Sequence, residues 1–76
     1  MSPVHGTVAL NTYLQSVGKQ ASLSWIDVSE GPVHAPMWTC TCKVDGQAVA
    51  TGTGTHKHLA RDAAADKALP ILTRST

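Results

Sequence analysis

Residues 52–69 read GTGTHKHLARDAAADKAL and place an interrupted strand directly before an alanine-rich helix. The glycines at positions 52 and 54 break a run of β-forming residues. From Thr55 onward the alanines recur at helical spacing, so one side of the helix carries small side chains that allow close approach to a sheet. A helix is therefore predicted over residues 56–69, and Pro70 is expected to end it or to kink its last turn. The residues expected to face the sheet are Ala60, Ala64, Ala65, Ala68 and Leu72.

The preceding segment predicts a pair of antiparallel strands. Residues Met37–Val44 alternate in polarity, as expected for a strand that is buried on one face only. Asp45-Gly46 favours a tight hairpin turn, and Gln47–Thr53 is expected to return as the next strand. The side chains expected on one face of the first of these strands are Trp38, Cys40, Cys42 and Val44, with Thr39, Thr41 and Lys43 on the other.

A further strand is predicted over Leu23–Ser29, which is rich in β-forming residues and precedes Glu30-Gly31-Pro32. The sequence leaves its register open. If Ile26 and Val28 face the helices, Trp25 lies on the open face of the sheet, where an exposed tryptophan is a candidate protein contact. If the register is shifted by one residue, Trp25 is buried instead.

The N-terminal part of the chain predicts a second helix. Leu10, Leu14 and Val17 recur at helical spacing over residues 8–17. Thr7 is the expected N-cap, and Gly18 is the expected C-terminal stop. Residues 1–6 are expected to form a lead-in and residues 74–76 a tail, so that one domain spans residues 7–73. The predicted fold is α+β, with element order α-β-β-β-α.

The composition is that of a globular protein, with 42% hydrophobic and 14% charged residues. No apolar run approaches the ~20 residues that a membrane helix needs, and no secretory signal pattern is visible. A soluble protein of the cytoplasm or nucleus is therefore expected. Cys40 and Cys42 are expected to be reduced, because neighbours on one face of a strand are poorly placed for a disulfide. The net charge of +1 does not by itself indicate a nucleic-acid partner.

The sequence contains no pattern that indicates a metal site, a cofactor or catalysis. The spacing of its histidines and cysteines matches none of the usual zinc patterns. Its five acidic residues are scattered over strands, turns and a helix. Asp62 and Asp66 are expected to lie on a solvated helix face. The residues weighed as zinc ligands are His34, His56, His58, Cys40 and Cys42.

Several short motifs follow one another along the chain. They are Leu10-Asn11-Thr12-Tyr13-Leu14-Gln15, Gly31-Pro32-Val33-His34, Trp38, Asp45-Gly46, Gly52-Thr53-Gly54, Lys57-His58-Leu59-Ala60-Arg61 and Ala64-Ala65 with Ala68-Leu69. In this combination, over residues 7–72, the chain resembles the double-stranded RNA-binding domain family. The resemblance implies a three-stranded antiparallel sheet with two helices packed on one face, in agreement with the fold predicted from the residues.

The resemblance also implies non-catalytic binding of RNA duplexes by shape and backbone charge. Such a domain spans ~16 base pairs and contacts two successive minor grooves and the major-groove phosphates between them. In the family, the positions of Lys57, His58 and Arg61 bridge the phosphates from one side of the helix start. The position of His34, in a turn shaped by Pro32, enters a minor groove. The remaining RNA-facing positions lie on the first helix and are Val8, Asn11 and Thr12, although Val8 could also belong to the core.

Three residues depart from the family pattern. Thr12 replaces the usual glutamate, His58 a lysine, and His56 a serine. Histidine carries less charge than lysine at neutral pH, so RNA binding should tighten as the pH falls from about 7.5 to about 6. The low net charge also fits a family member that serves as a protein-interaction or dimerisation module, with Trp25 as a contact. The expected partners are therefore double-stranded RNA or, alternatively, a protein or a second copy of the chain.

Overall fold

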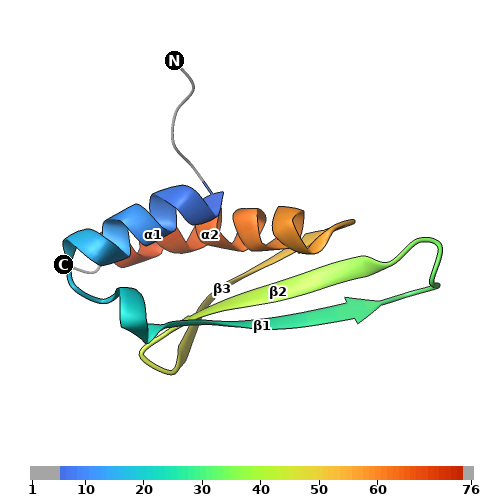
Figure 1. Cartoon of the computed structure of the whole chain (residues 1–76), viewed down its shortest axis with the longest axis horizontal. Helices are drawn as coiled ribbons and strands as arrows, with labels where there is room; N and C mark the ends of the chain where they lie inside the picture. Colours follow the sequence, from blue (N-terminus) through green and yellow to red (C-terminus); the bar gives the residue numbers. More distant parts are fainter. Residues whose placement is uncertain (1–5, 75–76) are drawn as a thin grey trace, which may run out of the picture.

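The computed structural model describes residues 6–74, so most of the predicted lead-in and tail lies outside the described residues. A helix, three strands and a second helix follow one another in the predicted order, with one short 3-10 turn between the first helix and the first strand (Figure 1). The elements are α1 (Gly6–Ser16), η1 (Gln20–Ser22), β1 (Leu23–Glu30), β2 (Met37–Val44), β3 (Gln47–Gly54) and α2 (Lys57–Arg74).

The three strands form one antiparallel sheet in the order β1-β2-β3, and both helices lie on the same side of it (Figure 1). This arrangement confirms the predicted α+β fold. The hairpin between β2 and β3 turns at Asp45 and Gly46, whose φ angles of 56° and 80° are those that a tight two-residue turn requires. The strand pairing shifts between Cys42 and Lys43, which marks a β-bulge.

The strand register places Trp25 on the side of the helices. Trp25 pairs with Cys42, which is fully buried, and directly paired residues point to the same face. The alternating neighbours Ile26 and Val28 point away from the helices and are 48% and 44% exposed. The prediction that Trp25 lies on the open face is therefore wrong. Packing explains the difference, because the tryptophan ring covers far more of the apolar core than either aliphatic side chain.

The core lies between the sheet and the helices and is built from small aliphatic groups, as predicted. It contains Leu10 and Leu14 of α1, Cys42 and Val44 of β2, and alanines of α2. Both cysteines are buried free thiols, which confirms their predicted reduced state. The alanines allow α2 to approach β3 directly. A Cβ atom on Gly52 would lie 2.3 Å from the backbone nitrogen of Ala64, so only glycine fits this contact.

The start of α1 is bonded to side chains of α2. The helix begins at Gly6, and the Gly6 amide donates to Asp66 Oδ1 at 2.6 Å. The Thr7 amide and hydroxyl both donate to Asp62 Oδ1, at 3.0 and 3.1 Å. The prediction of Thr7 as N-cap is therefore wrong. Asp66 is exposed as predicted, but Asp62 is partly buried, and both carboxylates bind the start of α1. Carboxylates are favourable partners for the free amides and positive dipole of a helix start.

The last turn of α2 continues past Pro70 to Arg74. Proline removes one helical hydrogen bond and crowds the preceding turn. Tertiary contacts offset this cost, because Leu69 and Leu72 pack against the core and the Tyr13 hydroxyl donates to the Leu72 carbonyl at 3.3 Å. Of the two alternatives predicted for Pro70, an end of the helix is therefore wrong, and a kink of the last turn stays a prediction.

Candidate nucleic-acid interface

The first turn of α2 presents two exposed basic side chains, Lys57 and His58. The His56 carbonyl accepts the Ala60 amide at 3.0 Å, so helical hydrogen bonding starts at His56. The amides before Ala60 consequently point out of the helix start, where the dipole favours an anion. The rings of His56 and His58 are stacked, with centroids 5.7 Å apart. This turn therefore combines a lysine, two imidazoles and free amides, which suits a phosphate group.

The Lys57 side chain also lies over the aromatic ring of Trp38. Its ammonium lies 5.1 Å from the centroid of the Trp38 ring, within the range of a cation–π contact. The side chain remains exposed. Trp38 therefore limits the freedom of the lysine without removing its charge from the surface.

Arg61 has a different environment from its two predicted companions. Its Nε donates to Asp27 Oδ1 at 3.1 Å, and its Nη2 forms an ion pair with Asp27 Oδ2. The guanidinium carbon lies 5.4 Å from the centroid of the Trp25 ring. Only 36% of the Arg61 side chain and 16% of the Asp27 side chain are exposed. Arg61 therefore differs from Lys57 and His58, because its guanidinium is turned toward Asp27 of β1.

The pair between Arg61 and Asp27 also sets the local electrostatics. The hydrogen bond from Arg61 lowers the pKa of Asp27, although partial burial opposes the shift. The same hydrogen bond raises the pKa of Arg61. Burial, followed by the hydrogen bond to Asp27, raises the pKa of Cys40 to about 11. Asp27 and Arg61 are thus both charged at neutral pH, and Cys40 is a neutral thiol.

The loop between β1 and β2 brings His34 beside the start of α2. The Ala35 amide donates to the Pro32 carbonyl at 3.0 Å and closes a turn that leaves His34 exposed. His34 lines a shallow hollow whose opposite wall is formed by Thr55 and His56. Figure 1 shows this loop at the end of the sheet that extends past the helices, next to the beginning of α2. Two of the predicted contact regions are therefore adjacent.

The third predicted region, on α1, is exposed, and its Val8 and Thr12 lie beside Leu69 and Thr73 near the end of α2. Val8 is 62% exposed, so it is not a core residue, and Asn11 and Thr12 are exposed as well. The Thr12 hydroxyl donates to the Val8 carbonyl at 2.9 Å, so its proton is used within the helix and its oxygen is left to accept hydrogen bonds. The hydrogen bond between Thr7 and Asp62 fixes the start of α1 beside the second turn of α2.

The β1–β2 loop, the start of α2 and helix α1 therefore follow one another along the molecule (Figure 1). We call this the basic surface, defined by His34, Lys57, His58, Asn11 and Thr12. Sequence reasoning missed Asp27 and Asp62, which position its parts. The alternation of β1 could have revealed Asp27, because it places Asp27 on the same face as Trp25 and toward the helices.

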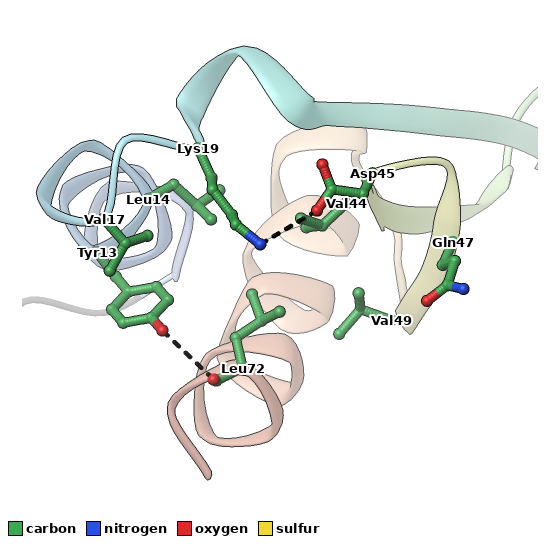
Figure 2. A pocket seen from close by; sticks show the side chains of 9 residues that line it. All are labelled: Tyr13, Leu14, Val17, Lys19, Val44, Asp45, Gln47, Val49 and Leu72. Atoms are coloured by element: carbon green, nitrogen blue, oxygen red, sulfur yellow. Dashed lines mark hydrogen bonds and ion pairs between the residues drawn. The ribbon is translucent and has the colours of Figure 1, made fainter. Parts of the chain in front are cut away.

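An apolar cavity of about 220 Å³ lies at the other end of the domain, between the two helices and the β2–β3 hairpin. Figure 2 shows the Tyr13 hydroxyl on the Leu72 carbonyl on one side, and Lys19 paired with Asp45 at 3.3 Å on another. Val44 and Val49 complete the lining between them. The cavity lies at the end of β2 away from the β1–β2 loop, and none of the residues that define the basic surface lines it.

No helix within residues 6–74 is long and apolar enough to cross a membrane. Within the same range, no group of three or more histidine, cysteine, aspartate or glutamate side chains is arranged to hold a metal ion.

The family model described as double-stranded RNA binding motif matches residues 9–72, which includes every strand and most of both helices. A search of the curated proteins found no match.

Proposed function

Because this chain belongs to the double-stranded RNA binding motif family, we propose that it binds RNA duplexes through the basic surface and performs no catalysis itself. The family is one of binding domains that recognise double-stranded RNA. The observation that carries the proposal for this chain is the continuity of the basic surface. His34 lies beside the start of α2, and the start of α1 is bonded to the second turn of α2, so that the loop and the two helices can follow a duplex together.

The shape of an A-form duplex explains why three separate regions are needed. Its major groove is too deep and narrow for side chains to read, whereas its minor groove is shallow and presents 2′-hydroxyl groups. We assign Lys57, His58 and the amides at the start of α2 to the phosphates across the major groove. His34, in the turn formed at Pro32, is assigned to one minor groove.

The exposed side of α1 is assigned to the next minor groove. Asn11 offers both a donor and an acceptor to a ribose hydroxyl. Thr12 offers only an acceptor, because its hydroxyl proton is bound to the Val8 carbonyl. Val8 provides apolar contact with the sugar edge. This chemistry contains no base-specific pair, so we expect recognition of shape with little preference for sequence.

A charge-removal experiment tests the assignment. Lys57→Ala removes a cation from the basic surface, whereas Lys43→Ala removes the same charge from the open face of the sheet, where Lys43 pairs with Ser24. We expect Lys57→Ala to weaken binding of a 20-base-pair RNA several-fold. The slope of log affinity against log salt concentration should also become shallower by about 0.9, the value for one phosphate contact. Lys43→Ala should leave both unchanged. Equal loss in the two variants would mean that binding does not use this surface.

The alternative function is protein interaction. In the structure, the residues available for such a contact are not Trp25 but the exposed apolar side chains of the open sheet face. Trp25 packs beneath α2, whereas Ile26, Val28 and Met37 are each 44–48% exposed. A pure interaction module would show no affinity for duplex RNA and would depend on that open face. Ile26→Ser would then abolish an association that Lys57→Ala leaves intact. We also propose that the protein acts in the cytoplasm or nucleus, where RNA duplexes occur.

A further inference from the structure

We propose that Asp27 is a positioning residue that keeps Arg61 out of the phosphate contacts. By sequence, the first two turns of α2 offer two permanent cations. In the folded domain, only Lys57 and the titratable His58 would serve the RNA backbone. The inference rests on the proposed RNA-binding function. It adds that Asp27 of β1 lowers the affinity for RNA duplexes by pairing with Arg61.

The geometry of the ion pair supports this role. Both carboxylate oxygens of Asp27 are used, Oδ1 by the Arg61 Nε at 3.1 Å and Oδ2 by the Nη2 group. Such a two-point contact fixes the plane of the guanidinium as well as its position. The carboxylate is the better buried partner, with 16% of its side chain exposed. The arginine therefore has to leave a largely enclosed, fully charged partner before it can reach outward.

The packing around the pair holds the guanidinium further. Trp25 and Asp27 lie on the same face of β1, and Arg61 reaches both of them from α2. Lys57, one turn earlier, lies over Trp38 of β2 but stays exposed. Two neighbouring strands thus each place a tryptophan near one cation of α2. Only β1 adds an acid, so only Arg61 is neutralised.

The consequence for binding follows from counterion release. Affinity for a nucleic acid falls with salt according to the number of phosphates that the protein neutralises. An arginine paired with an aspartate has no net charge to contribute to that number. Neutralising Asp27 alone should therefore free Arg61 to neutralise a phosphate. Removing the charges of both Asp27 and Arg61 should leave the affinity for RNA and its salt dependence unchanged.

The experiment compares the salt dependence of RNA binding in four proteins. They are the unaltered protein, Asp27→Asn, Lys57→Ala and the double variant Asp27→Asn with Arg61→Gln. Each is titrated with a 20-base-pair RNA between about 0.05 and about 0.2 M salt, after thermal unfolding has shown that it is folded. We expect Asp27→Asn to bind several-fold more tightly, with a slope steeper by up to about 0.9. The double variant should keep the original slope and affinity, and Lys57→Ala should lose about 0.9 of slope.

The outcomes separate this inference from the proposed function. If the unaltered protein shows no salt-dependent RNA binding, the proposed function fails and this inference fails with it. If the unaltered protein binds but the salt slope of the double variant is smaller by about 0.9, the value for one phosphate contact, then Arg61 does contact phosphate. In that case only this inference is overturned. The resonance of the Arg61 Nε–H group in the unaltered protein gives a reading that does not depend on any variant folding. It should stay in place on RNA addition while the amides of Lys57 and His58 shift, and a large shift of the Arg61 signal would contradict the inference.

Discussion

Replacing Gly52 by alanine should separate α2 from the sheet. A Cβ atom at this position would lie 2.3 Å from the Ala64 nitrogen and 2.5 Å from the Ala60 carbonyl oxygen. Both are backbone atoms, so no side chain can rotate away to make room. Ordinary contact begins at 3.4 Å, so α2 would have to move by roughly 1 Å. Trimming Ala64 to glycine would not rescue the variant, because the clash is with the helix backbone.

The size of the effect can be bounded. Overpacking a core costs about 1–3 kcal/mol, and a rigid backbone neighbour places Gly52→Ala at the upper end. A domain of 76 residues has roughly 4–11 kcal/mol of stability in total. About 3 kcal/mol would lower the Tm by about 12–24 °C in a domain of this size. Since α2 carries Lys57 and His58, RNA binding should weaken even at temperatures where the variant is folded.

Thermal unfolding followed by circular dichroism measures this effect, with Gly46→Ala as the matched control. Gly46 has a φ of 80° but open space around its missing Cβ, so alanine there incurs only backbone strain. That strain is about 1–2 kcal/mol. No positive φ is involved at Gly52, so its loss would be steric. If Gly52→Ala unfolds within about 2 °C of the unaltered protein, the proposed direct contact between α2 and β3 does not exist.

Two other predictions concern thiol reactivity and capping. The pKa of Cys40 in the folded protein is raised to about 11, so as the pH rises its thiol ionises in the unfolded chain before it ionises in the folded protein. Stability against denaturant should therefore fall as the pH rises from 9 toward 11. Stability that rises over this range would refute the assignment. The Cys40 thiol should also resist labelling at pH 8 until the protein is unfolded, whereas rapid labelling of the folded protein would contradict its burial. Finally, Asp62→Ala should lower the Tm by about 4–8 °C through loss of about 1 kcal/mol of capping at α1, with Glu30→Ala as an exposed control that should change little.

The order of elements was predictable because each has a strong local signal. The alternation of Met37–Val44, the Asp45-Gly46 turn and the alanine repeat of α2 each depend on near neighbours in the sequence. The buried cysteines followed from the same alternation. The helix ends were less accurate, because α1 begins at Gly6 through bonds to a helix that is 55 or more residues away.

The candidate site was predictable only in part, for a related reason. His34, Lys57 and His58 lie on exposed turns and helix ends, where residue type and spacing are sufficient to place them. The pairing of Arg61 with Asp27 spans 34 residues and depends on the register of β1, which the sequence left open. The same register decided the position of Trp25. Long-range contacts of this kind are set by packing, and no local pattern encodes them.

The most direct test of the account is a comparison of affinities for one 20-base-pair sequence as duplex RNA, as duplex DNA and as single-stranded RNA, all at the same salt concentration. A surface that follows an A-form duplex and its 2′-hydroxyls should retain the RNA duplex at concentrations where the other two are released. Equal affinity for the three, or none for any of them, would contradict the claim that the basic surface is built to straddle double-stranded RNA.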